Sequence, residues 1–145
     1  MKFVGIDYGL ARTGLAASDP EGRMVFPLAT LRLADFPSRH LLLDALAQRL
    51  IAEGTEAVVM GLPLLPDGSE SLTTRQVRNV TERLKRRLPL PFYYMSEELS
   101  SEEAWVDLRE AGLTRKKRKD VLDQQAAVRI LSSFLALDRQ KWSRA

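Results

Sequence analysis

The chain has 145 residues, enough for one domain with a full hydrophobic core, and 45% hydrophobic and 28% charged residues are ordinary for a globular protein. It has no cysteine and one histidine, which excludes disulfides and thiolate metal sites and argues against histidine-ligated zinc. Any metal would be held by carboxylates, which favour Mg²⁺ or Mn²⁺. No apolar run approaches the roughly 20 residues of a membrane span, and the first strand begins at once, so we expect a cytoplasmic protein without a signal peptide.

The N-terminal stretch predicts a central strand that ends at a carboxylate. The apolar run 3–6 leads into Asp7, and Gly9 and Gly14 follow. A carboxylate at this place could hold a divalent cation, and the glycines would let a phosphate or a backbone approach closely. A turn in which Asp7 caps its own backbone explains this stretch equally well when it is taken alone.

The rest of the pattern predicts a three-stranded meander followed by helices that alternate with strands. Strands are expected at residues 2–7, 12–18, 24–31, 57–61 and 92–95, and helices at 37–53, 71–88, 100–111 and 119–139. Pro27 places the third strand at an edge, and the continuously apolar fourth run fits a buried parallel strand. Ser38 and Gly54 are the expected caps of the first helix.

Two further acids stand where they could join Asp7. Glu97 follows the strand at 92–95, at the carboxyl end where ligands bind in sheets of parallel strands; an ordinary helix-start acid is the alternative. Asp123 borders the apolar face of the last helix, next to small alanines that would let this helix lie close to the sheet. A solvated acid at the edge of that face is the common alternative.

The net charge is only +3, but the basic residues are clustered. One group comprises Arg75, Arg78, Arg83, Lys85, Arg86 and Arg87, and a run of five comprises Arg115, Lys116, Lys117, Arg118 and Lys119. Such clusters suit DNA or RNA, although a solvated face or a mobile basic loop is the usual alternative. For the run of five we favour nucleic acid. His40, in the first turn of a helix, is interpreted as an exposed or capping side chain rather than a general base.

Three motifs occur in order along the chain. Residues 5–19 read G-I-D-Y-G-x-x-R-x-G-x-A-x-S-D, residues 61–69 contain Gly-Leu-Pro and Asp-Gly-Ser, and residues 123–131 read D-Q-x-A-A-x-x-I-L. Together they resemble the YqgF/RuvX family of the RNase H-like superfamily, over nearly the whole chain. The resemblance implies an α/β, RNase H-like fold: a five-stranded mixed sheet of order 3-2-1-4-5, with strand 2 antiparallel and helices on both faces. We expect one domain over residues 1–138 and a frayed tail over residues 139–145.

The family is described as Holliday junction resolvases and pre-16S rRNA processing nucleases. The resemblance therefore implies a metal-dependent endonuclease that hydrolyses phosphodiester bonds in structured nucleic acid. It implies Asp7, Glu97 and Asp123 as catalytic residues and as ligands of two Mg²⁺ or Mn²⁺ ions, with Arg12 and residues 115–119 holding the nucleic-acid backbone. Processing of the pre-16S rRNA 5′ end is slightly favoured over DNA recombination. Resolution of a symmetric junction would need two sites, hence a homodimer.

The chain departs from the family after the last strand. Where the family usually has Asp-Glu-Arg, this chain has Ser96, Glu97 and Glu98, so Glu98 is a further candidate ligand. The alternative function is a nucleic-acid-binding module of the same fold with weakened catalysis. An actin-like ATPase shares the general form of the opening motif, but it needs two domains, for which this chain is too short.

Overall fold

The computed structural model describes residues 1–97 and 115–145, with side chains from residue 120 onward in the second segment. Its strands are β1 (Phe3–Tyr8), β2 (Arg12–Ser18), β3 (Val25–Arg32), β4 (Ala57–Pro63), β5 (Phe92–Glu97) and β6 (Ser143–Arg144). Its helices are α1 (Arg39–Ala52), α2 (Leu72–Arg87) and α4 (Arg115–Ala136), with 3-10 turns at Leu33–Asp35 and Arg139–Lys141.

The strands form one mixed sheet in the order β3-β2-β1-β4-β5-β6. The pairs β1–β2 and β2–β3 are antiparallel, whereas β1–β4 and β4–β5 are parallel. The predicted order of the first five strands is confirmed, and β3, which contains Pro27, lies at the edge. The sheet has six strands rather than five because β6 pairs antiparallel with β5.

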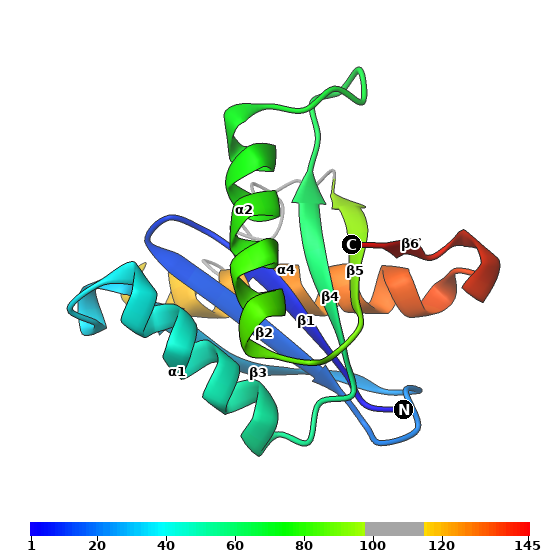
Figure 1. Cartoon of the computed structure of the whole chain (residues 1–145), viewed down its shortest axis with the longest axis horizontal. Helices are drawn as coiled ribbons and strands as arrows, with labels where there is room; N and C mark the ends of the chain where they lie inside the picture. The colour runs from blue at the N-terminus through cyan, green and yellow to red at the C-terminus, as the bar shows by residue number, and fades with distance from the viewer. Residues whose placement is uncertain (98–114) are drawn as a thin grey trace.

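Helices cover both faces of the sheet (Figure 1). Helices α1 and α2 lie on one face and α4 crosses the other. The strands have apolar side chains on both faces, so each face buries its own core: Val4, Ile6 and Met60 pack under α1 and α2, while Phe3 and Val59 pack against α4. This three-layer arrangement confirms the predicted fold class.

The C-terminal residues, expected as a frayed tail, instead pack against the sheet. Trp142 stacks on Phe134 with ring centroids 4.5 Å apart, meets Phe3 edge-on at 5.6 Å, and its Nε1 donates to the Phe134 carbonyl at 3.2 Å. The prediction missed this because a short, polar segment carries no periodic pattern, whereas one aromatic side chain is enough to anchor it.

Local sequence signals account for the helix boundaries. The Ser38 hydroxyl accepts from the Leu41 amide, and Gly54 has φ +70° after α1, as predicted. Ser71 and Thr74 form a capping box at the start of α2. Helix α4 begins at Arg115, four residues before the predicted start, and the helix predicted at 100–111 lies outside the described residues. Within the described parts of the chain, no helix is both long and apolar enough to cross a membrane.

Candidate active site

Asp7 lies near the end of β1, on the face of the sheet that α4 covers. Its neighbours Ile6 and Tyr8 point into the opposite core, because side chains alternate along a strand. Asp7 pairs with Gly14 of β2 inside the ladder, so it is a strand residue and not a turn cap. Burial raises the pKa of Asp7 to about 6, and the negative charge of Asp123 adds to the rise.

Asp123 approaches Asp7 because α4 rests directly on β2. A Cβ atom at Gly14 would collide with the backbone carbonyl of Asp123, so only glycine leaves room for the helix there. Since Gly14 is paired with Asp7, the close approach brings Asp123 beside the first carboxylate. Gly14, which the sequence marked as a point of close approach, thus lets the helix lie close to β2 at Asp123.

Arg12 holds the carboxylate of Asp123. Its Nε donates to Oδ2 at 2.7 Å, and the two side chains are only 30% and 17% exposed. Burial raises the pKa of Asp123, while the hydrogen bond and the charge of Arg12 oppose that rise. The arginine therefore offsets part of the effect of burial on the pKa of Asp123 and limits the orientation of its carboxylate.

Glu97 enters the site from the end of β5. It pairs with Pro63 of β4, and its carboxylate lies over Gly61, where an added Cβ would be 2.9 Å from Oε2. Burial, and then the negative charge of Asp7, raises the pKa of Glu97 to about 8. Because Gly61 has no side chain, there is room above it for the Glu97 carboxylate.

Asp7 is the common neighbour of the other two acids. Carboxylate oxygens are the donors that Mg²⁺ and Mn²⁺ prefer, and a cation would relieve the repulsion that helps to raise these pKa values. Within residues 1–97 and 120–145, no three acidic or histidine side chains converge closely enough to hold one ion. The donor set therefore fits divalent cations by its chemistry, as two acid pairs that share Asp7 rather than as one closed triad.

A second set of polar contacts fixes the first half of α4. Arg32 of β3 forms an ion pair with Asp120, and the Thr30 hydroxyl donates to the Asp120 carbonyl at 3.0 Å. Gln124 Nε2 donates to the same hydroxyl at 3.1 Å. We did not identify these residues from the sequence, because partners 88 or more positions apart leave no local pattern.

A comparison of the whole sequence with known protein families identifies the family of this chain. Residues 1–137 match the family model described as "RuvX: Holliday junction resolvase". The chain belongs to the RuvX family. Among its RuvX relatives, a protein of Nitratidesulfovibrio vulgaris (strain DP4) is 54% identical over 145 residues, 100% of both chains. One from Cutibacterium acnes is 36% identical over 134 residues, 91% of this chain and 80% of that protein. Both are named "Putative pre-16S rRNA nuclease".

Solved structures resemble this RuvX chain in fold. A Thermus thermophilus RuvC structure covers 100% of both chains with a TM-score of 0.62 at 17% identity. RuvC from the same organism in complex with a Holliday junction substrate also matches, with a TM-score of 0.62 at 18% identity over 100% of this chain and 99% of that one. The expected RNase H-like fold is thereby confirmed.

The remaining predicted residues of this RuvX chain fall into three groups. Arg12, predicted to contact nucleic acid, is engaged with Asp123, and its phosphate contact stays a prediction. The basic run 115–119 forms the first turns of α4 rather than a loop before it, and Glu98 lies outside the described residues. His40 lies on α1, across the sheet from the acids, and contacts Asp44 and Arg87, which agrees with its interpretation as an exposed side chain.

Proposed function

We propose that this chain is a divalent-cation-dependent endonuclease that hydrolyses phosphodiester bonds in structured nucleic acid. The observation that carries the proposal is the cluster of Asp7, Glu97 and Asp123, buried between the sheet and α4 with raised pKa values. Raised carboxyl pKa values mean that folding disfavours the ionised acids, so the cluster costs stability at neutral pH. Acids retained at such a cost fit a functional site better than a structural one.

The residues have distinct roles in this proposal. Asp7, the common neighbour of the other two acids, would hold a cation together with Asp123 and a cation together with Glu97. Bound divalent cations would supply an activated water as nucleophile and stabilise the leaving oxygen. Burial and the charge of Asp7 favour the protonated form of Glu97 near neutral pH, and a cation nearby would favour its ionised form. Arg12 orients Asp123, and residues 115–119 would contact phosphates without reading sequence.

The substrate class follows from the relatives. Their name supports pre-16S rRNA as a substrate, and the family description supports the Holliday junction. Both are structured nucleic acids with a dense phosphate backbone. A homodimer is required only for the symmetric junction, because that reaction needs two active sites.

Cleavage assays with matched variants test the proposal. The substrates are a four-way DNA junction and a pre-16S rRNA fragment, each with Mg²⁺, Mn²⁺ or EDTA. We expect the wild-type protein to cleave only when the cation is present, and the Asp7→Asn variant not to cleave at all. Asp138 is an exposed acid outside the site, so the Asp138→Asn variant should keep wild-type activity. Substrate binding without cleavage under any cation would instead support the weakened binding module. Reverting Ser96→Asp together with Glu98→Arg would then be the next variant.

A further inference from the structure

Helix α2, on the sheet face opposite the carboxylates, carries one of the two concentrations of positive charge in the chain; the other is the run 115–119 at the start of α4. Its 16 residues include six basic side chains and one acid, Glu82, a net charge of +5. The whole chain carries only +3, so everything outside α2 sums to −2. The basic residues of the last turn suit the helix dipole, but Arg75, Arg78 and Arg83 lie before it and are not explained in this way.

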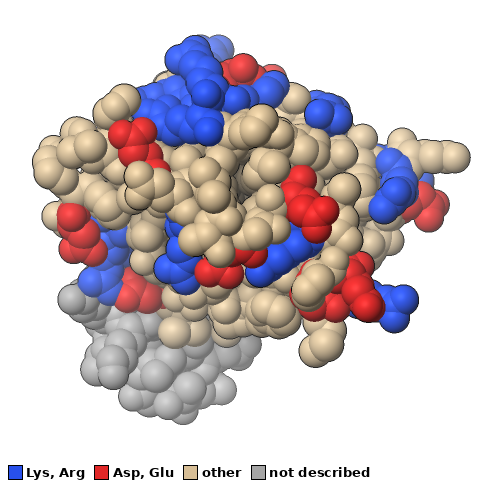
Figure 2. Space-filling view, turned by 60° about the horizontal axis from the view of Figure 1, so that its bottom comes forward, with Lys and Arg blue, Asp and Glu red and all other residues tan. Residues whose placement is uncertain are grey.

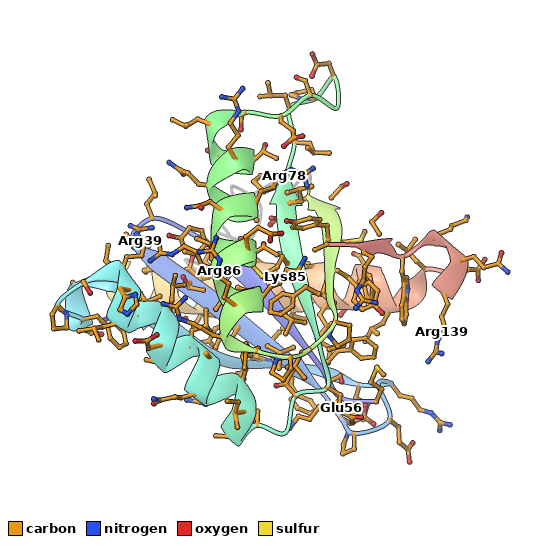
Figure 3. All side chains as sticks on the ribbon, viewed as in Figure 1. Arg39, Glu56, Arg78, Lys85, Arg86 and Arg139 are labelled. Atoms are coloured by element: carbon orange, nitrogen blue, oxygen red, sulfur yellow. The ribbon has the colours of Figure 1, made fainter. Side chains whose placement is uncertain are left out.

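The basic side chains surround the solvent side of α2. Arg75 and Arg86 are exposed and lie on the same side of the helix, three turns apart. Arg78 and Lys85 flank them toward β5 (Figure 3), and Arg78 lies over the Tyr94 ring at 5.0 Å. Arg87 flanks them toward α1, where it pairs with Asp44. Figure 2 shows Lys and Arg side chains gathered at the top of that view, where α2 lies.

Among the described residues, ion pairs involve three of the six basic side chains of α2. Arg78 pairs with Glu70 at 2.6 Å, Lys85 with Glu82 at 3.4 Å and Arg87 with Asp44 at 2.8 Å. Salt bridges between the described residues include none to Arg75, Arg83 or Arg86. Arg83 and Arg86 are three residues apart on the helix surface, and like charges at this spacing repel each other.

We propose that the exposed side of α2, defined by Arg75, Arg83 and Arg86, binds the phosphate backbone of a double-helical arm of the nucleic-acid substrate, away from the scissile bond. From Arg75 to Arg86 the helix rises roughly 16 Å. Measured along the axis of a DNA duplex, each strand carries a phosphate about every 3.4 Å, so several can face this stripe. The sheet separates α2 from Asp7, so the bound arm is a different segment from the one at the carboxylates. The inference rests on the proposed function only in treating the arm as part of a nuclease substrate.

The test compares two variants that each remove three positive charges. The first is Arg75→Gln with Arg83→Gln and Arg86→Gln, and the matched control is Arg23→Gln with Arg139→Gln and Lys141→Gln, which are exposed basic residues on other parts of the surface. Binding to a four-way junction with 20-base-pair arms and to a pre-16S rRNA hairpin is measured by fluorescence anisotropy in EDTA over a range of NaCl concentrations. The slope of log K against log [NaCl] counts phosphate contacts.

We expect the α2 variant to bind at least 10-fold more weakly than the control and to reduce the salt slope by roughly 2–3. The lysine version, Arg75→Lys with Arg83→Lys and Arg86→Lys, should restore most of the binding, which excludes misfolding as the cause. Unchanged binding in the α2 variant, or an equal loss in both triple variants, overturns the inference and leaves the surface to another partner such as an acidic protein. If wild type binds through α2 but cleaves nothing, the inference stands and the proposed function fails.

Discussion

At the scale of the residue, the ionisation of Glu97 opposes folding. The ordinary pKa of 4.5 rises to about 8 in the folded protein. Between these values the folded chain holds a proton that the unfolded chain has lost, so the free energy of unfolding falls as pH rises through this window. Below about pH 4.5 the carboxyl is protonated in both states, and its contribution to stability is fully present.

Replacing Glu97 by Gln should therefore remove a pH-dependent loss of stability. In EDTA, we expect Glu97→Gln to be more stable than wild type by about 2 kcal/mol at pH 9 and by much less at pH 5, because glutamine cannot ionise. Chemical denaturation at the two pH values measures this difference. A Glu97→Gln advantage that is the same at pH 5 and pH 9 would show that packing, and not charge, is responsible.

Arg12 can be tested as a positioning residue against its predicted role as a phosphate contact. If it acts through Asp123, Arg12→Gln should lower kcat roughly 10- to 100-fold with little change in KM, because the carboxylate loses its orientation. If it contacts substrate instead, KM should rise and the salt dependence of binding should weaken by about one phosphate contact. Steady-state kinetics at two salt concentrations separate these outcomes.

At the scale of the element, the site depends on how closely α4 lies on the sheet. The glycines at positions 14 and 5 lack side chains that would hold the helix away, and Arg12 and Arg32 then hold it in place from the strands. The opening motif therefore supplies both the first carboxylate and the surface on which the helix with the third carboxylate rests.

Gly14→Ala should displace the helix and with it Asp123. We expect a loss of about 1–3 kcal/mol of stability from overpacking, together with loss of cleavage. The matched control is Gly54→Ala, where φ is +70° and no atom lies within 4 Å of an added Cβ. This control should cost about 1 kcal/mol through backbone strain alone and should keep full activity. Equal activity in the two variants would contradict the role given to Gly14.

At the scale of the whole molecule, the sheet separates the carboxylates from the basic helix α2. The carboxylates lie under α4 on one face, and α2, with six basic residues, covers the other. A nucleic acid engaged with both must pass around the edge of the sheet or branch. This separation suits a structured substrate better than a short single strand.

Most of this organisation could be predicted from the sequence. The apolar runs and turn residues predicted the first five strands along the chain, and the family resemblance implied their order in the sheet. Acids at the ends of β1 and β5 indicated the candidate site. The ion pairs of Arg12 and Arg32 with α4 could not be predicted, because their partners lie 111 and 88 positions away and neither shares a local pattern with its partner. β6 was missed for a related reason: two exposed residues become a strand only because Trp142 anchors the chain beside β5.

The central claim is that Asp7, Glu97 and Asp123 together bind divalent cations. The most direct test is titration calorimetry with Mn²⁺ at pH 7. Two buffers of different ionisation enthalpy are used, because the difference in measured heat between them reports how many protons are released. Because Glu97 is largely protonated at that pH, we predict that wild type binds Mn²⁺ with release of a proton, and that Asp7→Asn loses the binding while Asp138→Asn retains it. Binding that is the same in wild type and Asp7→Asn, or that releases no proton, would contradict the account.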